Sequence, residues 1–282
     1  MTESLQLDIA HLRSWIGREE RVEGALTPDL ALKFAATFNM SGDFKEGEIA
    51  PPLVHFCLGQ HVMPTALLGG DGHPERGAFL PPVPLLRRMW ASGNLIIGET
   101  LRVGDIISRI SRIADVTAKQ GRSGTLCFVA VEHRITVDGR DIITERQDIV
   151  YRGDARPSAD ASPKLAPAGE HRRSFDPTPT VLFRYSALTF NGHRIHYDRP
   201  YAMKEEGYPG LVVHGPLQAT LLYNFATELR GRPPSRFSFR SQSPLFDGGP
   251  FGLHASETAE TIALWTAAEN GPVAMAAEAR WT

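Results

Sequence analysis

The clearest periodic pattern in the chain is GPLQATLLYNFATEL, residues 215–229. Leucine and phenylalanine recur there at the three- and four-residue spacing of a helix with one apolar face. The residues on this face are Leu217, Leu221, Leu222, Phe225 and Leu229. Pro216 suits the first helical position, which makes Gly215 the predicted N-cap. A shorter helix is predicted over residues 27–38, where Thr27 can cap the helix ahead of a proline.

Strand patterns surround these helices. The segments 125–137 and 140–152 are rich in β-branched and aromatic residues and are joined by Asp-Gly, a strong signal for a hairpin with a type I′ turn. Residues 106–119 can supply another strand before the hairpin, and residues 236–281 contain further strand-like segments after the long helix. A long helix followed by antiparallel strands predicts an α+β unit in which a sheet wraps around a helix. The first half of the chain is compatible with a degenerate version of the same plan.

One segment divides the chain into two parts. DARPSADASPKLAPAGE, residues 154–170, contains three prolines, many alanines and no aromatic residue, which is typical of an extended tether. We therefore expect an N-terminal domain at residues 1–153, a linker at 154–170 and a C-terminal domain at 171–282. The sequence contains no internal repeat strong enough to prove duplication.

Composition narrows the class of protein. Hydrophobic residues make up 42% and charged residues 22% of the 282 residues, as in ordinary globular proteins. The formal net charge of −2 gives no overall attraction for nucleic acid or an anionic membrane, and no apolar run approaches the roughly 20 residues that span a bilayer. The N-terminus lacks the pattern of a secretory signal. Cys57 and Cys127 are far apart, so we expect buried thiols and a cytoplasmic location.

The densest cluster of reactive side chains is TFNGHRIHYD, residues 189–198, which is followed by LVVHGP at 211–216. Three interpretations compete. His193 and His196 form an H-x-x-H pair, but two ligands on one helical face need a spacing of four, so no metal is expected. These residues can also be turn residues and hydrogen-bonded histidines without a chemical role. The third interpretation is acid–base chemistry on a small substrate.

Hydration of an enoyl-thioester fits the third interpretation. The reaction needs a group that deprotonates water, a proton for the α-carbon, and donors for the charge that develops on the thioester oxygen. An imidazole exchanges protons near neutral pH. An unpaired amide at a helix start can donate to the oxygen, and Gly215 would allow a close approach.

The same residues carry a resemblance. TFNGHRIHYDRPYA (189–202) and GYPGLVVHGPLQATLL (207–222) resemble the active-site segment of MaoC-like hydratases with the hotdog fold. The nearest branch contains hydroxyacyl-thioester dehydratase type 2 and the mesaconyl-CoA and itaconyl-CoA hydratases. Residues 77–93 and 115–133 resemble the FAS1-like dehydratase N-terminal hotdog of that branch. The resemblance covers nearly the whole chain. It implies a double hotdog, two units that each wrap an antiparallel sheet around a long helix, with catalysis in the second.

The chain departs from the wider family at one catalytic position. Hydratases of that family use an Asp and a His five positions later, and aligning this pair on His196 places Asn191 where the Asp should be. An amide can orient water but cannot accept its proton. The resemblance therefore implies His196 or His193 as the acid–base group, with one imidazole able to take and return the proton. Gly215 remains the predicted oxyanion donor.

Several residues are candidates for substrate binding. Arg87 and Arg88, just before Trp90, suit a substrate carboxylate because guanidinium binds carboxylates in a bidentate manner, although they can equally be structural arginines. The arginine-rich segment 230–240 suits the phosphates of coenzyme A or a solvated face. From these segments and the motif we expect the following substrate-binding residues: Arg87, Arg88, Trp90, Arg194, His214, Arg236 and Arg240. His214 can also simply hold the helix entrance.

The sequence therefore predicts a hydro-lyase that hydrates a short, branched, dicarboxylic enoyl-CoA. Itaconyl-CoA or mesaconyl-CoA would give citramalyl-CoA, as in itaconate degradation. The alternatives are a 3-hydroxyacyl-thioester dehydratase of fatty acid synthesis and a non-catalytic acyl-CoA-binding protein. Coenzyme A is part of the substrate, and no metal or redox cofactor is expected. By analogy with hotdog proteins we expect a homodimer.

Overall fold

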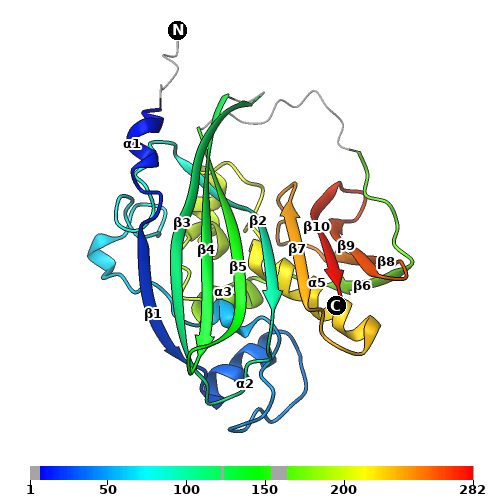
Figure 1. The fold of residues 1–282 in the computed structure, drawn as a ribbon. Coiled ribbons are helices and arrows are strands. Elements are labelled where there is room, and N and C mark those ends of the chain that lie inside the picture. Colours follow the sequence, from blue (N-terminus) through cyan, green and yellow to red (C-terminus); the bar gives the residue numbers. More distant parts are fainter. Residues whose placement is uncertain (1–6, 122–123, 154–163, 282) are drawn as a thin grey trace.

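The structure, a computed structural model, describes residues 7–121, 124–153 and 164–281. Its main feature is one antiparallel sheet of 10 strands in the order β1-β3-β4-β5-β2-β7-β10-β9-β8-β6. Strands β1 to β5 come from the first half of the chain and strands β6 to β10 from the second, and Figure 1 shows the two halves side by side. The α+β class that the sequence predicts is confirmed.

The N-terminal unit contains the predicted short helix and hairpin. Its elements are α1 (Ile9–Arg13), β1 (Glu19–Ala25), α2 (Pro28–Thr37), β2 (Arg87–Ile97), β3 (Ile106–Gly121), β4 (Gly124–Val137) and β5 (Arg140–Arg152). The hydroxyl of Thr27 accepts a hydrogen bond of 3.1 Å from the amide of Leu30, which caps α2 as predicted. Asp138 and Gly139 adopt φ values of 50° and 78° between β4 and β5, as a type I′ turn requires.

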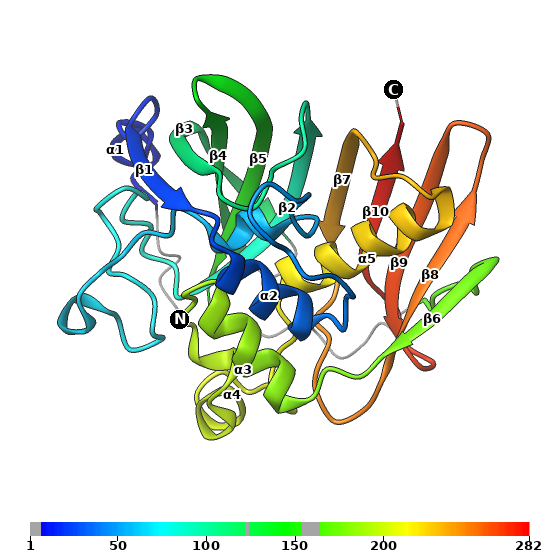
Figure 2. The same ribbon diagram turned by 90° about the horizontal axis from the view of Figure 1, so that it is seen from below.

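The C-terminal unit contains the predicted long helix. Its elements are β6 (His171–Phe175), α3 (Pro179–Leu188), α4 (Arg199–Lys204), α5 (Gly215–Arg230), β7 (Arg236–Ser241), β8 (Phe251–Glu257), β9 (Thr261–Ala268) and β10 (Val273–Arg280). Figure 2 shows α5 lying across the inner face of β7 to β10, where it buries its apolar face. One detail differs from the prediction. His214 has the extended backbone of an N-cap, so the helix begins with Gly215 itself.

The two units have the same topology. Counted within each unit, the strands lie in the order first, third, fourth, fifth, second, and in each unit a helix of similar length, α2 or α3, follows the first strand. Figure 2 shows α2 and α3 packed against each other. The duplication that the sequence does not reveal is therefore visible in the fold, and the double hotdog is confirmed.

The long helix is present only in the second unit. Between α2 and β2 the first unit has only two short 3₁₀ helices, Val54–Cys57 and Thr65–Leu67. The expectation of a long helix in each unit is therefore wrong for the N-terminal one. Leu53 and Gly59 flank the first 3₁₀ helix with left-handed φ values of 60° and 59°, so the helix cannot continue in either direction. The missing helix leaves room on the inner face of β3, β4 and β5.

The two units share one sheet because β2 pairs with β7. Strand β5 ends at Arg152 and β6 begins at His171, close to the predicted boundaries. Residues 154–163 of the predicted linker lie outside the described residues. The part from 164 to 170 runs along the C-terminal sheet, where Trp265 donates to the carbonyl of Pro167 at 3.1 Å. Both cysteines are free and buried, as expected. Among the described residues, no helix is long and apolar enough to cross a membrane.

Candidate active site

The motif TFNGHRIHYD forms a tight loop between α3 and α4. Phe190 takes a left-handed φ of 50° after α3, and the amide of Asn191 then donates to the carbonyl of Ser186 at 2.8 Å. The side-chain oxygen of Asn191 accepts the amide of His193 at 3.0 Å, which leaves its NH₂ group to face the cavity. Asp198 ends the loop as N-cap of α4, accepting from the amide of Tyr201 at 3.1 Å. Asp198 therefore fixes the local turn.

His196 is held in one tautomer. Its Nδ1 lies 2.7 Å from the carbonyl oxygen of Val212, and because a carbonyl only accepts, Nδ1 carries the proton. In the neutral ring Nε2 is then a proton acceptor, and the side chain lines the same cavity as Gly215 and Asn191. Burial lowers the pKa of His196 to about 4, while the bond to Val212 opposes this shift. His196 is thus a neutral base at physiological pH.

The ring of His214 packs against the ring of His196. The two rings are stacked with centroids 3.7 Å apart, and Nε2 of His214 lies 2.8 Å from the hydroxyl of Ser186. Burial lowers the pKa of His214 well below its usual value, so this ring is neutral as well. His214 does not line the cavities of the site. It lies at the helix entrance as the N-cap of α5, and its contacts are with Ser186 and His196.

Gly215 begins α5 directly beside Trp90. A Cβ atom at Gly215 would lie 3.0 Å from Cε3 of Trp90, tighter than ordinary contacts, so a side chain does not fit without movement. The amide of Gly215 has no intrahelical acceptor, because a helical amide donates to the carbonyl four residues earlier and the residues before Gly215 are not helical. This amide, at the positive end of a 16-residue helix, can donate to a developing oxyanion. Trp90 lines the cavity as predicted.

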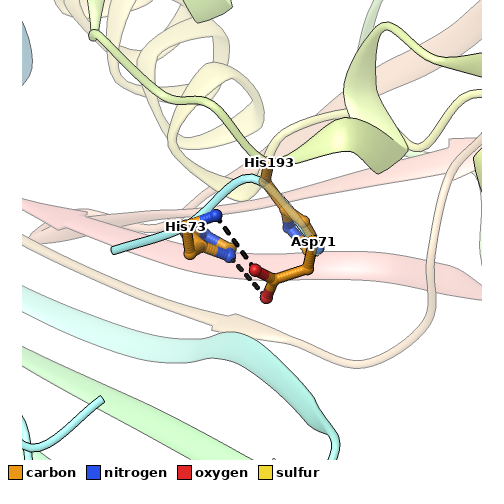
Figure 3. A group of neighbouring side chains, drawn as sticks. All are labelled: Asp71, His73 and His193. Atoms are coloured by element: carbon orange, nitrogen blue, oxygen red, sulfur yellow. Dashed lines mark hydrogen bonds and ion pairs between the residues drawn. The ribbon is translucent and has the colours of Figure 1, made fainter. Parts of the chain in front are cut away.

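A histidine that the sequence analysis missed enters the site from the N-terminal unit. Figure 3 shows Asp71 and His73 next to His193. The carboxylate of Asp71 lies 3.0 Å from Nδ1 of His73, and the rings of His73 and His193 have centroids 4.1 Å apart. Because the carboxylate accepts, Nδ1 of His73 carries the proton and Nε2 is free to accept one. The only sequence signal was the D-x-H pattern in GGDGHPE, which does not reveal its neighbour.

The segment that carries Asp71 and His73 contacts the loop of residues 189–198 through the backbones of two glycines. A Cβ on Gly72 would lie 1.9 Å from the carbonyl oxygen of Gly192, and a Cβ on Gly192 would lie 2.4 Å from the oxygen of Gly72. The amide of Arg194 also donates to the carbonyl of Asp71 at 2.9 Å. Any larger residue at either glycine would separate the loops. The close approach of these backbones therefore brings His73 and His193 together.

The histidine cluster is neutral. Burial lowers the pKa of His193, and the nearby His73 and His196 lower it further. Burial and Arg88 lower the pKa of His73 to about 4, although Asp71 opposes the shift. Desolvation opposes ionisation of Asp71, but the contacts with His73 outweigh it and lower the pKa of this carboxyl. The cluster therefore combines one carboxylate with proton-accepting imidazoles.

The histidines of the H-x-x-H pair have different partners. Nδ1 of His196 is bonded to Val212, whereas His193 belongs to a group of possible ligands among the described residues, with Asp71 and His73, whose atoms lie within 4.8 Å of one another. These three residues could hold a cation. The carboxylate of Asp71 is, however, already engaged by the ring and the amide of His73.

Two connected cavities flank the histidines. The first, here called the mouth cavity, has a volume of about 670 Å³ and is lined by His193, His196 and Gly215. The second, the acyl chamber, has a volume of about 620 Å³ and extends onto the N-terminal sheet in the room left by the missing helix. Four residues line both cavities: His73, Trp90, Asn191 and Pro216. The polar loop thus lies where the two cavities meet.

The arginines near the site have different surroundings. Arg87 forms an ion pair of 3.6 Å with Glu206 and donates to the carbonyl of that residue, so its guanidinium serves a structural contact at the mouth cavity. Arg88 lines the same cavity. Arg194 donates to Asp198 at 2.8 Å and lies over the ring of Tyr201, outside both cavities. Its contacts are those of a loop-fixing residue, contrary to the expected substrate contact.

Arg236 and Arg240 do not reach the site. They are exposed on β7 and alternate with the buried Phe237 and Phe239, which face the core. Because side chains of a strand alternate between its two faces, both arginines lie on the outer face of the sheet, away from the mouth cavity and the acyl chamber. The structure therefore does not bring them together with the other predicted site residues, and on β7 they form part of a solvated face.

Fold and site together are those of a double-hotdog enzyme that acts on an acyl thioester. The family profile described as hydroxyacyl-thioester dehydratase type 2 matches residues 53–247. A mesaconyl-C(4)-CoA hydratase from Chloroflexus aurantiacus is 45% identical over 267 residues, which cover 94% of this chain and 95% of the relative. The mitochondrial hydroxyacyl-thioester dehydratase type 2 of Schizosaccharomyces pombe is 41% identical over 233 residues, 73% of this chain and 78% of the relative.

Solved structures agree on the fold. A MaoC-like dehydratase from Phytophthora capsici superimposes with a TM-score of 0.71 at 14% identity, covering 98% of this chain and 99% of the other. A Mycobacterium tuberculosis protein described as a double hotdog gives a TM-score of 0.58 at 13% identity and covers 94% and 96%. The chain belongs to the hydroxyacyl-thioester dehydratase type 2 family of MaoC-like proteins and is a hydro-lyase of that family.

Proposed function

We propose that the protein hydrates a short, branched, dicarboxylic enoyl-CoA, converting mesaconyl-CoA or itaconyl-CoA to citramalyl-CoA. The observation that carries this proposal is the identity of 45% over 94% of the chain to a mesaconyl-C(4)-CoA hydratase. The site supports mesaconyl-C4-CoA in particular, whose double bond is conjugated with the thioester, because neutral imidazoles, an amide and a helix-start donor are the groups that addition of water to a conjugated thioester requires.

The water is activated by His196. The NH₂ group of Asn191 donates to the water oxygen and orients it, while Nε2 of His196 accepts a proton as the oxygen attacks the β-carbon. The protonated ring then delivers a proton to the α-carbon on the same side. Because Nδ1 stays bonded to the carbonyl of Val212, the same Nε2 atom both accepts and donates.

The thioester oxygen becomes negative while the β-carbon is attacked. The amide of Gly215 stabilises this charge, since it is unpaired and lies at the positive end of α5. The Trp90 ring beside Gly215 keeps water away from this oxygen, which strengthens the interaction. The coenzyme A portion extends through the mouth cavity, where Arg88 offers a positive charge to its phosphates.

His73 gives the site a second proton acceptor. Its Nε2 faces the histidine loop, and the carboxylate of Asp71 stabilises the ring when it becomes protonated. The N-terminal unit thereby contributes a carboxylate to a site in which Asn191 has replaced the usual one. A proton that reaches His73 through His193, whose ring contacts those of both His73 and His196, returns by the same route, so that His196 still delivers one proton to the α-carbon.

The proposal is tested with a panel of enoyl-CoA thioesters, assayed in a chelating buffer. We expect loss of the conjugated thioester absorbance with mesaconyl-CoA and appearance of citramalyl-CoA by mass spectrometry. Absence of turnover with every member of the panel would contradict the proposal. Turnover only after addition of a divalent cation would assign a metal to Asp71, His73 and His193, contrary to our expectation that no cofactor is used.

A second candidate is a 3-hydroxyacyl-thioester dehydratase of fatty acid synthesis. It is favoured by the identity of 41% over 73% of the chain to the Schizosaccharomyces pombe dehydratase. In that case long saturated 3-hydroxyacyl thioesters would be turned over faster than citramalyl-CoA in the reverse direction. We further propose that the enzyme is cytoplasmic and acts as a homodimer, which light scattering at micromolar concentration would reveal.

A further inference from the structure

The wall that the N-terminal unit contributes to the acyl chamber contains polar residues, and this part of the wall is here called the floor. Four of its residues lie on the inner face of neighbouring strands of the N-terminal sheet, and one comes from the 3₁₀ helix Val54–Cys57. They are Arg109 of β3, His133 of β4, Glu145 and Gln147 of β5, and His55. Glu145 and His55 are each only 2% exposed. Tyr185 and Asn191 of the catalytic unit line the same chamber.

The carboxylate of Glu145 is already satisfied by the protein. Its Oε1 accepts from Nε2 of Gln147 at 2.8 Å, and its Oε2 lies 3.5 Å from Nε2 of His55. Desolvation opposes ionisation of Glu145, but the contacts with His55 help to lower the pKa of this carboxyl. Glu145 is therefore a fixed anion whose partners are His55 and Gln147.

The donors of the floor are not satisfied. Among the described residues, Nε of Arg109 and Nε2 of His133 are buried without a hydrogen-bond partner. Nη1 of Arg109 makes only a long bond of 3.4 Å to the carbonyl of Leu58. Nδ1 of His133 lies 2.9 Å from the hydroxyl of Ser111, which can donate to it and leave Nε2–H as a donor. Buried donors without acceptors are costly and call for an acceptor that the chain does not supply.

The charge of Arg109 identifies the kind of acceptor. Burial lowers the pKa of Arg109, and the carboxylates of Glu145 and Glu20 oppose this shift, although neither forms an ion pair with the guanidinium among the described residues. A guanidinium in such surroundings binds a carboxylate well, since its planar fork matches the two oxygens. The rest of the chamber wall is largely apolar and includes Phe56, Ile135 and Phe183.

We infer that the floor of the acyl chamber binds the free carboxylate of the substrate's acyl group, with Arg109 as its main partner and His133 as a second donor. This inference rests on the proposed function and gives it a structural basis for specificity. It assigns the carboxylate to Arg109 in the acyl chamber, whereas Arg88 in the mouth cavity serves coenzyme A. Enoyl groups that end in a methyl would leave the donors of the floor unpaired and bind less well.

The test uses a matched pair of thioesters. Mesaconyl-C4-CoA and 3-methylcrotonyl-CoA differ only in a carboxylate that replaces a methyl group, and the ratio of their kcat/KM values measures the preference for the carboxylate. Arg109→Met should reduce this ratio at least about thirtyfold, with Arg109→Lys in between, because lysine keeps the charge but loses the fork. His133→Gln should reduce it by about tenfold. Arg112→Met is the control, since Arg112 is exposed on the same strand and should leave the ratio unchanged.

Binding of saturated analogues keeps the test independent of catalysis. Calorimetry with methylsuccinyl-CoA and isovaleryl-CoA should show that Arg109→Met weakens only the former, while Arg88→Met weakens both equally. An unchanged preference in folded Arg109→Met and Arg109→Lys would overturn the inference, as would a wild-type protein that does not distinguish the pair. Failure of the proposed function gives a different result, because the wild-type protein would then bind these thioesters without hydrating mesaconyl-CoA.

Discussion

The imidazoles of His196 and His214 are stacked with their ring centroids 3.7 Å apart and their planes inclined by only 17°. Both rings are anchored on opposite sides, His196 by the carbonyl of Val212 and His214 by the hydroxyl of Ser186. The stack leaves His196 one orientation, in which Nε2 is the acceptor. A base that is held in this way needs no rearrangement before it meets the substrate.

The rate should depend on pH through this base. Burial lowers the pKa of His196 to about 4, and protonation removes the acceptor, so kcat/KM should fall only as the pH decreases through about 4. We expect an acid limb with a slope near one and a midpoint well below the usual histidine value of about 6.5. Rates measured from pH 3.5 to 8 with mesaconyl-CoA would show this limb. A midpoint between 6 and 7 would mean that the ring is not desolvated in the free enzyme.

The stability of the folded protein should also depend on pH, between the pKa values that three of its histidines have in the unfolded and folded states. Burial lowers the pKa of His73, His133 and His196 to about 4 in the folded protein, whereas the unfolded chain binds protons near 6.5. The unfolded state therefore binds more protons between these values, and stability decreases as the pH falls from 6.5 toward 4. Each imidazole contributes up to about 1.4 kcal/mol per pH unit. Urea midpoints at pH 7, 6 and 5 should decrease in order, and equal midpoints would contradict this.

The contact between Gly215 and Trp90 should be essential for the oxyanion donor. Gly215→Ala places a Cβ against Cε3 of the indole, so we expect at least a tenfold loss of kcat, within the range observed when one oxyanion donor is displaced. Trp90→Phe removes the ring that carries this atom. The double variant should therefore lose less than the sum of the single losses, as a double-mutant cycle would show. Additive losses would show that Gly215 and Trp90 do not interact in catalysis.

The Asp71–His73 pair should contribute to the chemical step. Asp71→Asn keeps the size of the side chain but removes the charge that stabilises a protonated His73, so we expect kcat to fall about tenfold with little change in KM. Asp43→Asn changes an exposed aspartate that pairs only with Lys45 and is the matched control. A purely structural role of Asp71 would instead lower the thermal stability and leave kcat of the folded fraction unchanged.

Local patterns predicted most of the fold. The spacing of apolar residues located α5, and the Asp-Gly pair located the hairpin of β4 and β5, because both signals depend on neighbours in sequence. The loss of the long helix in the first unit was not predictable in this way. It depends on left-handed backbone at Leu53 and Gly59, and leucine gives no sign of that conformation.

The residues of the candidate site also differ in how well the sequence predicts them, depending on whether they belong to a local motif. Asn191, His196 and Gly215 belong to two short motifs, and the structure brings them to the same cavity. His73 lies more than a hundred residues earlier in the chain and reaches the site only because Gly72 and Gly192 pack backbone to backbone. The positions of Arg236 and Arg240 depend on which face of β7 meets α5, which the arginine content of the segment does not indicate.

Proton transfer by His196 is measured through the rate of a variant that lacks this imidazole. The kcat/KM of His196→Ala for mesaconyl-CoA is compared with that of the wild-type protein and of His171→Ala, which removes an exposed histidine on β6. We predict at least a hundredfold loss for His196→Ala, the usual contribution of an acid–base group, with thioester binding preserved and with His171→Ala unchanged. Turnover by His196→Ala at the wild-type rate would contradict the account.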